Sequence, residues 1–289
     1  MSTFSAILLL PLVELVLVAL LSGCVGALAY LDRKIFFAEA ITHGTFPGAV
    51  LGVVVAAALG GTHGQISMAL FLGAFLFCLP LGQMMRFLAR LPGISSQSAA
   101  GIVLSFAFAL GYFLAKWFAP LPLQVQAFLS GSLLTVNGVD VLFAALALGF
   151  ALASLLIWGK DLLSFSFDAE DYRARGGNAR LANALILGLV VVTIVIVIPA
   201  VGTVLSIGLL AAPAAGLAPL LRSTRSFLLL APLAALGIGL TGFVIGVHAN
   251  LSVGGTIAIV AAVFYAACRV LAHRGGRRGR PAGTRAEAA

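Results

Sequence analysis

Three residues within the segment RKIFFAEAITHGTFPGAVLG, residues 33–52, have types and spacing suited to binding a metal ion. Glu39, His43 and Pro47 are four residues apart, so on a helix they stack along one face. Pro47 has no N–H to donate to the carbonyl of His43, which favours a helix break at this point. A carboxylate, an imidazole and a freed carbonyl are all ligands for divalent cations. The segment therefore predicts a metal-binding strip formed by Glu39 and His43, beside a break at Pro47.

The chain around this strip is too apolar to face water on all sides. Of its 289 residues, 62% are hydrophobic and 9% are charged, whereas soluble domains have about 25% charged residues. This composition predicts a membrane protein that crosses the bilayer several times. The formal net charge is +8, but no soluble domain is left to form a nucleic-acid-binding surface, so no nucleic acid partner is expected.

Apolar runs of spanning length, about twenty residues each, predict an all-α transmembrane helix bundle with about nine spans. The runs are Ile7–Leu31, Phe36–Gly60, Ser67–Leu88, Ala99–Phe118, Val139–Trp158, Leu181–Ala200, Thr203–Leu221, Phe227–Val247 and Ser252–Ala272. A weaker run, Leu121–Val136, is flanked or interrupted by Pro120 and Pro122 and contains two glutamines. It is expected to be re-entrant or interfacial.

The basic residues predict how the bundle is oriented. With the N-terminus outside, 16 of the 17 Lys and Arg residues fall in inner loops or the C-terminal tail, and only Lys116 lies outside. The positive-inside rule therefore favours an N-out, C-in topology. We expect a transmembrane domain at residues 1–273. Residues 274–289, rich in glycine and arginine, should form a disordered basic cytoplasmic tail able to contact anionic membrane lipid.

Ionisable side chains at membrane depth are costly and are usually functional. On this topology His43 would lie near the middle of the bilayer, with Glu39 one turn away. The structural alternative is that Glu39 bonds to a neighbouring helix and His43 to a backbone carbonyl. The other spans offer little beyond Glu14 and scattered serines and threonines, so an intramembrane enzyme is not expected.

The remaining polar residues give weaker indications. The Gly159–Lys160 pair has Ser154 where a phosphate-binding loop needs its first glycine, and no Ser or Thr follows it, so ATP hydrolysis by this chain is not expected. The predicted outer connections contain Asp140, His63 and His248. The two histidines could meet an incoming metal ion or simply face water.

Five segments, in order along the chain, resemble the membrane permease subunit of bacterial ABC importers for zinc, manganese or iron. They are residues 33–52, GIVLSFAFALG (101–111), FLSGSLLTV (128–136), SFDAEDYRARG (166–176) and VGTVLSIGLLAAPAA (201–215). The resemblance extends from the first span to about Ala272. It places the family's intramembrane carboxylate and histidine on Glu39 and His43, although the family usually has aspartate at the first position.

This resemblance implies a multi-pass permease of the cytoplasmic (inner) membrane that imports zinc or manganese, with iron a further candidate. Such a permease is not an enzyme. It holds no permanent cofactor, forms a homodimer and binds a separate ABC ATP-binding subunit, while an extracellular or periplasmic metal-binding protein delivers the ion. The region that meets the ATPase would contain Pro213, Arg222 and Arg225, with Asp168 and Glu170 on the same side.

Three other functions remain open from the residues. A secondary transporter could couple to protons through Glu39 and would need no ATPase. An ABC permease for cobalamin or an iron–siderophore would have a wide path with few ligands and no dependence on His43. A membrane scaffold without transport activity would tolerate replacement of the polar residues in its spans.

Overall fold

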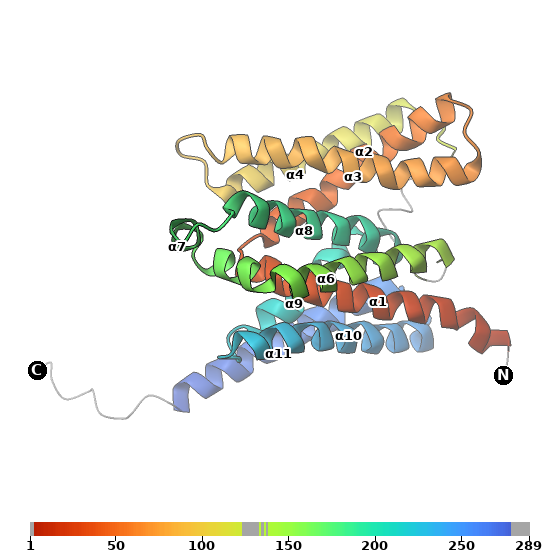
Figure 1. Cartoon of the computed structure of the whole chain (residues 1–289). Coiled ribbons are helices and arrows are strands. Elements are labelled where there is room, and N and C mark those ends of the chain that lie inside the picture. Colours follow the sequence, from red (N-terminus) through yellow and green to blue (C-terminus); the bar gives the residue numbers. More distant parts are fainter. Residues whose placement is uncertain (1–2, 123–132, 134–135, 137, 279–289) are drawn as a thin grey trace, which may run out of the picture.

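The computed structural model describes residues 3–122, 133, 136 and 138–278, which form ten helices and no strand (Figure 1). The helices are α1 (Thr3–Leu31), α2 (Ile35–Ala58), α3 (His63–Leu88), α4 (Ser96–Trp117), α6 (Gly138–Phe167), α7 (Ala169–Ala174), α8 (Ala179–Val201), α9 (Thr203–Leu217), α10 (Thr224–Ala249) and α11 (Val253–Arg278). The predicted all-α bundle is confirmed. Apart from four residues, the run Leu121–Val136 lies outside the described residues.

Within this part of the chain, eight helices are long and apolar enough to cross a membrane. The ninth pass is α9, whose 15 residues span about 22 Å and fall short of a full bilayer core. In Figure 1, α1 begins at one end of the bundle and α11 ends at the other. Ends on opposite sides require an odd number of passes, which agrees with the predicted count of about nine.

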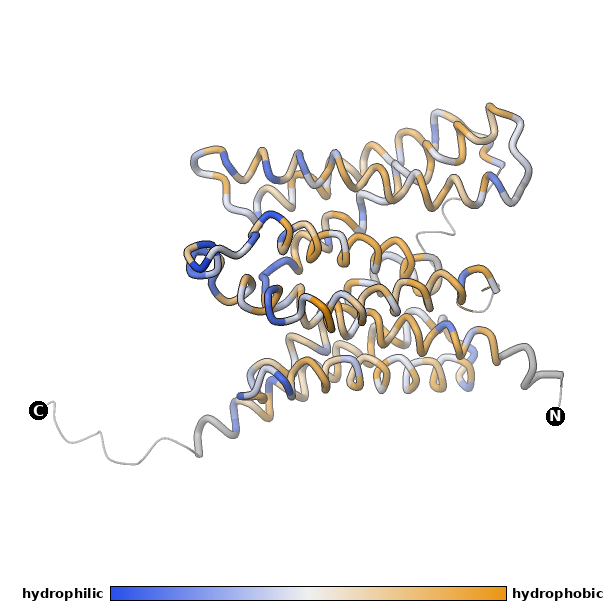
Figure 2. The backbone as a smooth tube through the Cα atoms, in the orientation of Figure 1, coloured by the Kyte–Doolittle hydropathy of each residue, from blue (hydrophilic) through white to orange (hydrophobic). Residues whose placement is uncertain are grey.

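The helices form two groups joined by a central pair (Figure 1). α2 packs against α3 and α4, whereas α1, α9 and α10 pack against one another and α11 packs against α9 and α10. α6 and α8 contact each other and lie between these groups. Figure 2 shows hydrophobic residues along the helices and most hydrophilic residues near the helix ends, as expected for a bundle surrounded by lipid.

Local sequence sets several helix ends. Thr62 and Gln65 form a capping box at the start of α3. Gly202, with φ of 87°, links α8 to α9 in a conformation that side chains disfavour. Asn250, a residue that tolerates the left-handed region, ends α10 with φ of 53°. These tight ends reverse the chain between consecutive passes.

Close helix contacts depend on glycine. A Cβ added to Gly52 of α2 would collide with the carbonyl oxygen of Ala69 in α3, and one on Gly73 would collide with the carbonyl oxygen of Gly48. In α1, a Cβ on Gly26 would meet the carbonyl oxygen of Leu210 in α9. Small residues that allow such backbone approach are a common means of packing helices in membranes.

The segment from Trp158 to Arg180, which connects two predicted spans, is mostly helical and not an extended loop. α6 continues to Phe167 because Leu162 and Phe165 on its extension are buried against the bundle. The short helix α7 and the start of α8 occupy most of the remaining segment. At the other terminus, α11 continues to Arg278, and residues 279–289 lie outside the described residues.

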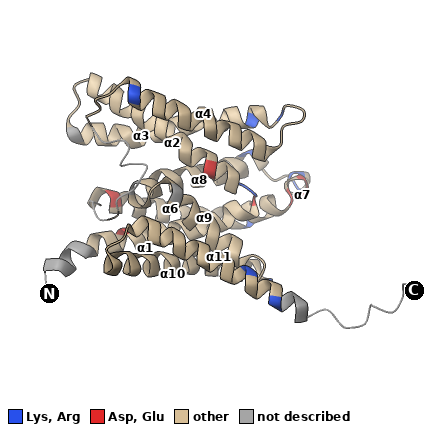
Figure 3. Cartoon of the chain, turned by 180° about the vertical axis from the view of Figure 1, so that it is seen from behind, with Lys and Arg blue, Asp and Glu red and all other residues tan. Residues whose placement is uncertain are grey.

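Basic residues gather at one end of the bundle. Figure 3 shows most Lys and Arg residues, coloured blue, near the end where α11 finishes. Lys116 is at the opposite end, in the last turn of α4. The positive-inside rule places the end of a bundle that is rich in Lys and Arg in the cytoplasm. The N-out, C-in orientation stays a prediction from this rule.

Candidate functional site

Glu39 and His43 occupy the only accessible positions in the central part of α2. Between Phe37 and Val50, every other residue is buried and these two are half-buried. They are one helical turn apart, about 6 Å along the axis, on a strip that opens at the surface of the protomer. The sequence prediction that they share a face is therefore supported by their common exposure.

The His43 side chain has a ring nitrogen that makes no hydrogen bond. Its ring packs edge-on against Phe108 of α4, with ring centroids 5.6 Å apart and an interplanar angle of 86°. The Nδ1 atom is buried and has no hydrogen-bond partner. The Glu39 carboxylate is close enough to act on the imidazole electrostatically. A neutral imidazole and a carboxylate in this arrangement could bind a divalent cation together.

Pro47 does not share the accessible strip. α2 runs through it without interruption from Ile35 to Ala58, and the residue is buried. A Cβ on Gly111 of α4 would lie 3.0 Å from the proline Cδ, so the two helices meet closely there. This packing holds the helix together where a hydrogen bond is missing. The prediction of a helix break at Pro47 is therefore wrong, because α2 continues through this residue.

One copy of the chain supplies too few ligands to enclose a metal ion. In the described part of the chain, no group of three or more His, Cys, Asp or Glu side chains could hold one. Zinc usually has four ligands, and manganese prefers about six. Glu39 and His43 would therefore need further ligands from water, backbone carbonyls or a second copy of the chain.

The two other histidines lie on different helix groups. His63 is the first residue of α3, and His248 is exposed in the last turn of α10. α3 belongs with α2 and α4, whereas α10 packs with α1, α9 and α11. Their role as an outer entry for metal stays a prediction.

The predicted coupling residues lie around the turn between α9 and α10. A groove of about 190 Å³ there is lined by residues including Leu31, Phe167, Arg222 and Phe227. Phe167 directly precedes Asp168, so the junction of α6 and α7 meets the turn that contains Arg222. Arg225 is exposed in the first turn of α10.

The other three predicted coupling residues differ in their surroundings. Asp168 caps α7, because its Oδ1 accepts hydrogen bonds of 2.9 Å from the N–H groups of Glu170 and Asp171. Glu170 is exposed, and Pro213 is buried inside α9. The four charged residues are therefore exposed to a partner, although Asp168 also caps α7, whereas the buried Pro213 cannot contact one directly.

Asp32 was not singled out by the sequence, because a charged residue in a short basic turn looks solvated. It follows α1, its side chain is only 11% exposed, and its nearest cation is Lys34, with Nζ 4.0 Å from Oδ2. Burial raises the pKa of the Asp32 carboxyl to about 6, and Lys34 offsets only part of this change. Ionised Asp32 therefore destabilises the folded chain.

Asp32→Asn is expected to stabilise the protein at neutral pH. Because the folded pKa lies above the usual 3.8, the folded state binds more protons between about pH 4 and 6, and the free energy of unfolding falls as pH rises through that window. Above pH 6 the cost should be about 3 kcal/mol. Thermal unfolding in detergent should show a larger gain at pH 7.5 than at pH 4.5. Equal gains at both pH values would contradict the charge argument, and exposed Glu170→Gln is the control.

Comparison with known proteins gives consistent matches over almost the whole chain. Residues 5–271 match the family model described as the ABC 3 transport family. The zinc transport system membrane protein TroC of Treponema pallidum is 32% identical over 245 residues, covering 83% of this chain and 80% of that protein. The manganese import system permease protein ScaB of Streptococcus gordonii is 26% identical over 255 residues, covering 88% and 87%.

The fold also matches a solved structure, PsaBC from Streptococcus pneumoniae in complex with Fab. The TM-score is 0.78 at 26% identity, and the match covers 91% of this chain and 90% of the other. The alignment therefore includes the helix groups on both sides of α6 and α8.

Proposed function

This chain belongs to the ABC 3 transport family, a family of membrane permeases, and we propose that it is the permease subunit of an importer for zinc or manganese. ATP hydrolysis takes place on a separate subunit, and a binding protein outside the membrane delivers the ion. The observation that carries the proposal is the half-buried pair Glu39 and His43 on a helix whose neighbouring residues are all buried. Relatives named for zinc and for manganese support the cargo class.

Contact between lipid and the Glu39–His43 pair would be energetically unfavourable. A carboxylate at membrane depth costs about 2.5–3.5 kcal/mol on insertion scales and faces protein or water in most membrane proteins. A second copy of the chain placed against α2 would cover the strip and bring two carboxylates and two imidazoles together. That set of four donors would complete a transient coordination shell for one ion.

The direct test is uptake of labelled zinc and manganese by cells that lack their own importers. The cells would express this chain with its ATPase and binding protein. Uptake of one metal that stops when the ATPase carries a hydrolysis-disabling substitution supports the proposal. Uptake by the chain alone, driven by a proton gradient, would instead support a secondary transporter. An assembled complex that hydrolyses ATP but takes up neither metal would favour a cobalamin or siderophore cargo.

We expect the turn between α9 and α10 to bind the ATPase. The combined substitution Arg222→Glu and Arg225→Glu should reduce co-purification of the ATP-binding subunit by at least about tenfold, because two exposed cations become repulsive to an acidic partner surface. Arg90→Glu, at an exposed arginine that follows α3, is the matched control. Equal loss in the control would point to a general charge effect and would contradict a specific contact.

A further inference from the structure

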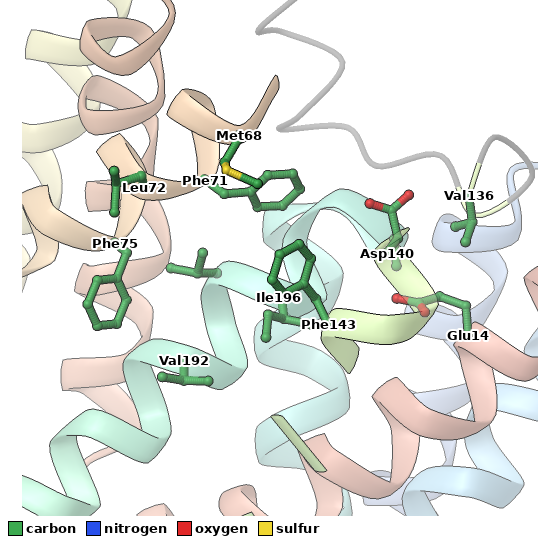
Figure 4. A pocket seen from close by; sticks show the side chains of 12 residues that line it. Glu14, Met68, Phe71, Leu72, Phe75, Val136, Asp140, Phe143, Val192 and Ile196 are labelled. Carbon is green, nitrogen blue, oxygen red and sulfur yellow. The ribbon is translucent and has the colours of Figure 1, made fainter. Parts of the chain in front are cut away.

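A cavity of about 550 Å³ lies between α1, α3, α6 and α8, apart from the strip on α2 (Figure 4). Its walls are almost entirely apolar, with Phe71, Phe75 and Phe143 among them. The exceptions are two carboxylates, Glu14 of α1 and Asp140 of the first turn of α6. No Lys, Arg or His is among the described residues that line this cavity.

Glu14 is buried at the edge of the cavity without the partner that a carboxylate normally requires. Its relative exposure is 1%, and its Oε2 atom has no hydrogen-bond partner. In Figure 4 the Glu14 and Asp140 carboxylates lie at one end of the cavity, with the Asp140 carboxylate directed away from Glu14, and the two groups act on each other electrostatically. An ionised carboxylate buried in this way is costly unless a cation accompanies it. A bound positive charge beside Glu14 would stabilise the ionised form of its carboxylate.

The shape and lining of the cavity indicate which kind of cation fits. Binding sites for drug-sized organic molecules have volumes of about 300–1,000 Å³ and mainly apolar walls with a few polar groups. A divalent metal ion needs about six oxygen ligands around it, whereas here oxygen ligands lie at one end and the rest of the wall is hydrocarbon. Phenylalanine faces also attract organic cations.

We propose that this cavity binds a bulky organic cation, with its positive charge near Glu14 and its apolar groups against Phe71, Phe75 and Phe143. The site shares no residue with the Glu39–His43 strip. It could therefore be filled while a metal ion occupies the strip.

Binding of labelled tetraphenylphosphonium to the purified full-length chain in detergent would test this site. Saturable binding is expected, and Glu14→Gln should weaken it at least about tenfold, because truncating one partner of a buried charge pair is strongly unfavourable. Tetraphenylborate has the same shape and the opposite charge, so it should not compete. Asp161→Asn, which removes an exposed carboxylate elsewhere on α6, should leave the affinity unchanged.

A second variant tests the apolar part of the site while both carboxylates remain. Val192→Trp places a large side chain into the cavity from α8 and should also weaken tetraphenylphosphonium binding. Thermal unfolding without ligand would confirm that both variants fold. The proposal fails if the folded protein shows no saturable binding, or if neither variant changes it. Displacement of tetraphenylphosphonium by micromolar Mn²⁺ would show a metal-ion site and overturn the organic assignment.

Discussion

Replacing both Glu39 and His43 with alanine is expected to reduce metal uptake to background in cells that still assemble the transporter. Each single alanine variant should lower uptake by at least about tenfold, the usual order of effect when a metal's environment is altered. The physical reason is that the two side chains are the only accessible residues between Phe37 and Val50, so no neighbour on α2 can replace a lost ligand. The measurement is the initial rate of labelled zinc or manganese entry.

Conservative variants separate loss of a ligand from loss of structure. Glu39→Asp keeps the carboxylate with a shorter reach and should retain most uptake, whereas Glu39→Gln keeps the size but loses the charge and should not. Asp161→Asn, an exposed carboxylate on α6, serves as the control for expression and general charge. Unchanged uptake in the double alanine variant, with the complex intact, would exclude the strip as part of the path.

The spans were predictable because the length and apolarity of a helix that crosses a membrane are local properties of the sequence. α2, α4 and α8 lie within a few residues of the predicted runs. The prediction was least accurate around Trp158, where α6 continues for nine more residues. Hydropathy falls there at Lys160 and Asp161, but Leu162 and Phe165 pack against the bundle. Burial by distant helices could not be seen in the local sequence.

In the candidate site, too, features set by the local sequence were predictable and features set by distant helices were not. The shared face of Glu39 and His43 follows from their spacing, since residues four apart are neighbours on any helix. The burial of Pro47 depends on Gly111 in α4, and a helical-face argument could not place it. Glu14 and Asp140 are separated by more than a hundred residues, so only the fold brings them into one cavity.

Gly52→Leu is expected to destabilise the protein by about 3 kcal/mol, at the upper end of the usual cost of overpacking. A Cβ at this position would meet the backbone carbonyl oxygen of Ala69, and it would lie 3.3 Å from the Cα of Gly73. Backbone atoms of a packed helix cannot move aside as a flexible side chain can, so α2 and α3 would have to separate. Thermal unfolding and the yield of monodisperse protein would measure the loss. Metal uptake should fall with it, since α2 carries Glu39 and His43.

Gly149→Leu in α6 is the matched control, because no atom lies within 4 Å of its would-be Cβ. It should be neutral or slightly stabilising, since leucine favours a helix over glycine by about 0.5–1 kcal/mol.

Gly44 in α2 provides a second comparison, because its would-be Cβ meets the side-chain Cδ1 of Leu81 and no backbone atom. The damage from Gly44→Ala should therefore be partly relieved by Leu81→Ala, less the cost of the cavity that this second change opens. No side-chain substitution can relieve Gly52→Leu in the same way. If Gly52→Leu and Gly149→Leu unfolded at the same temperature, close contact between α2 and α3 would not be what holds the metal strip in place.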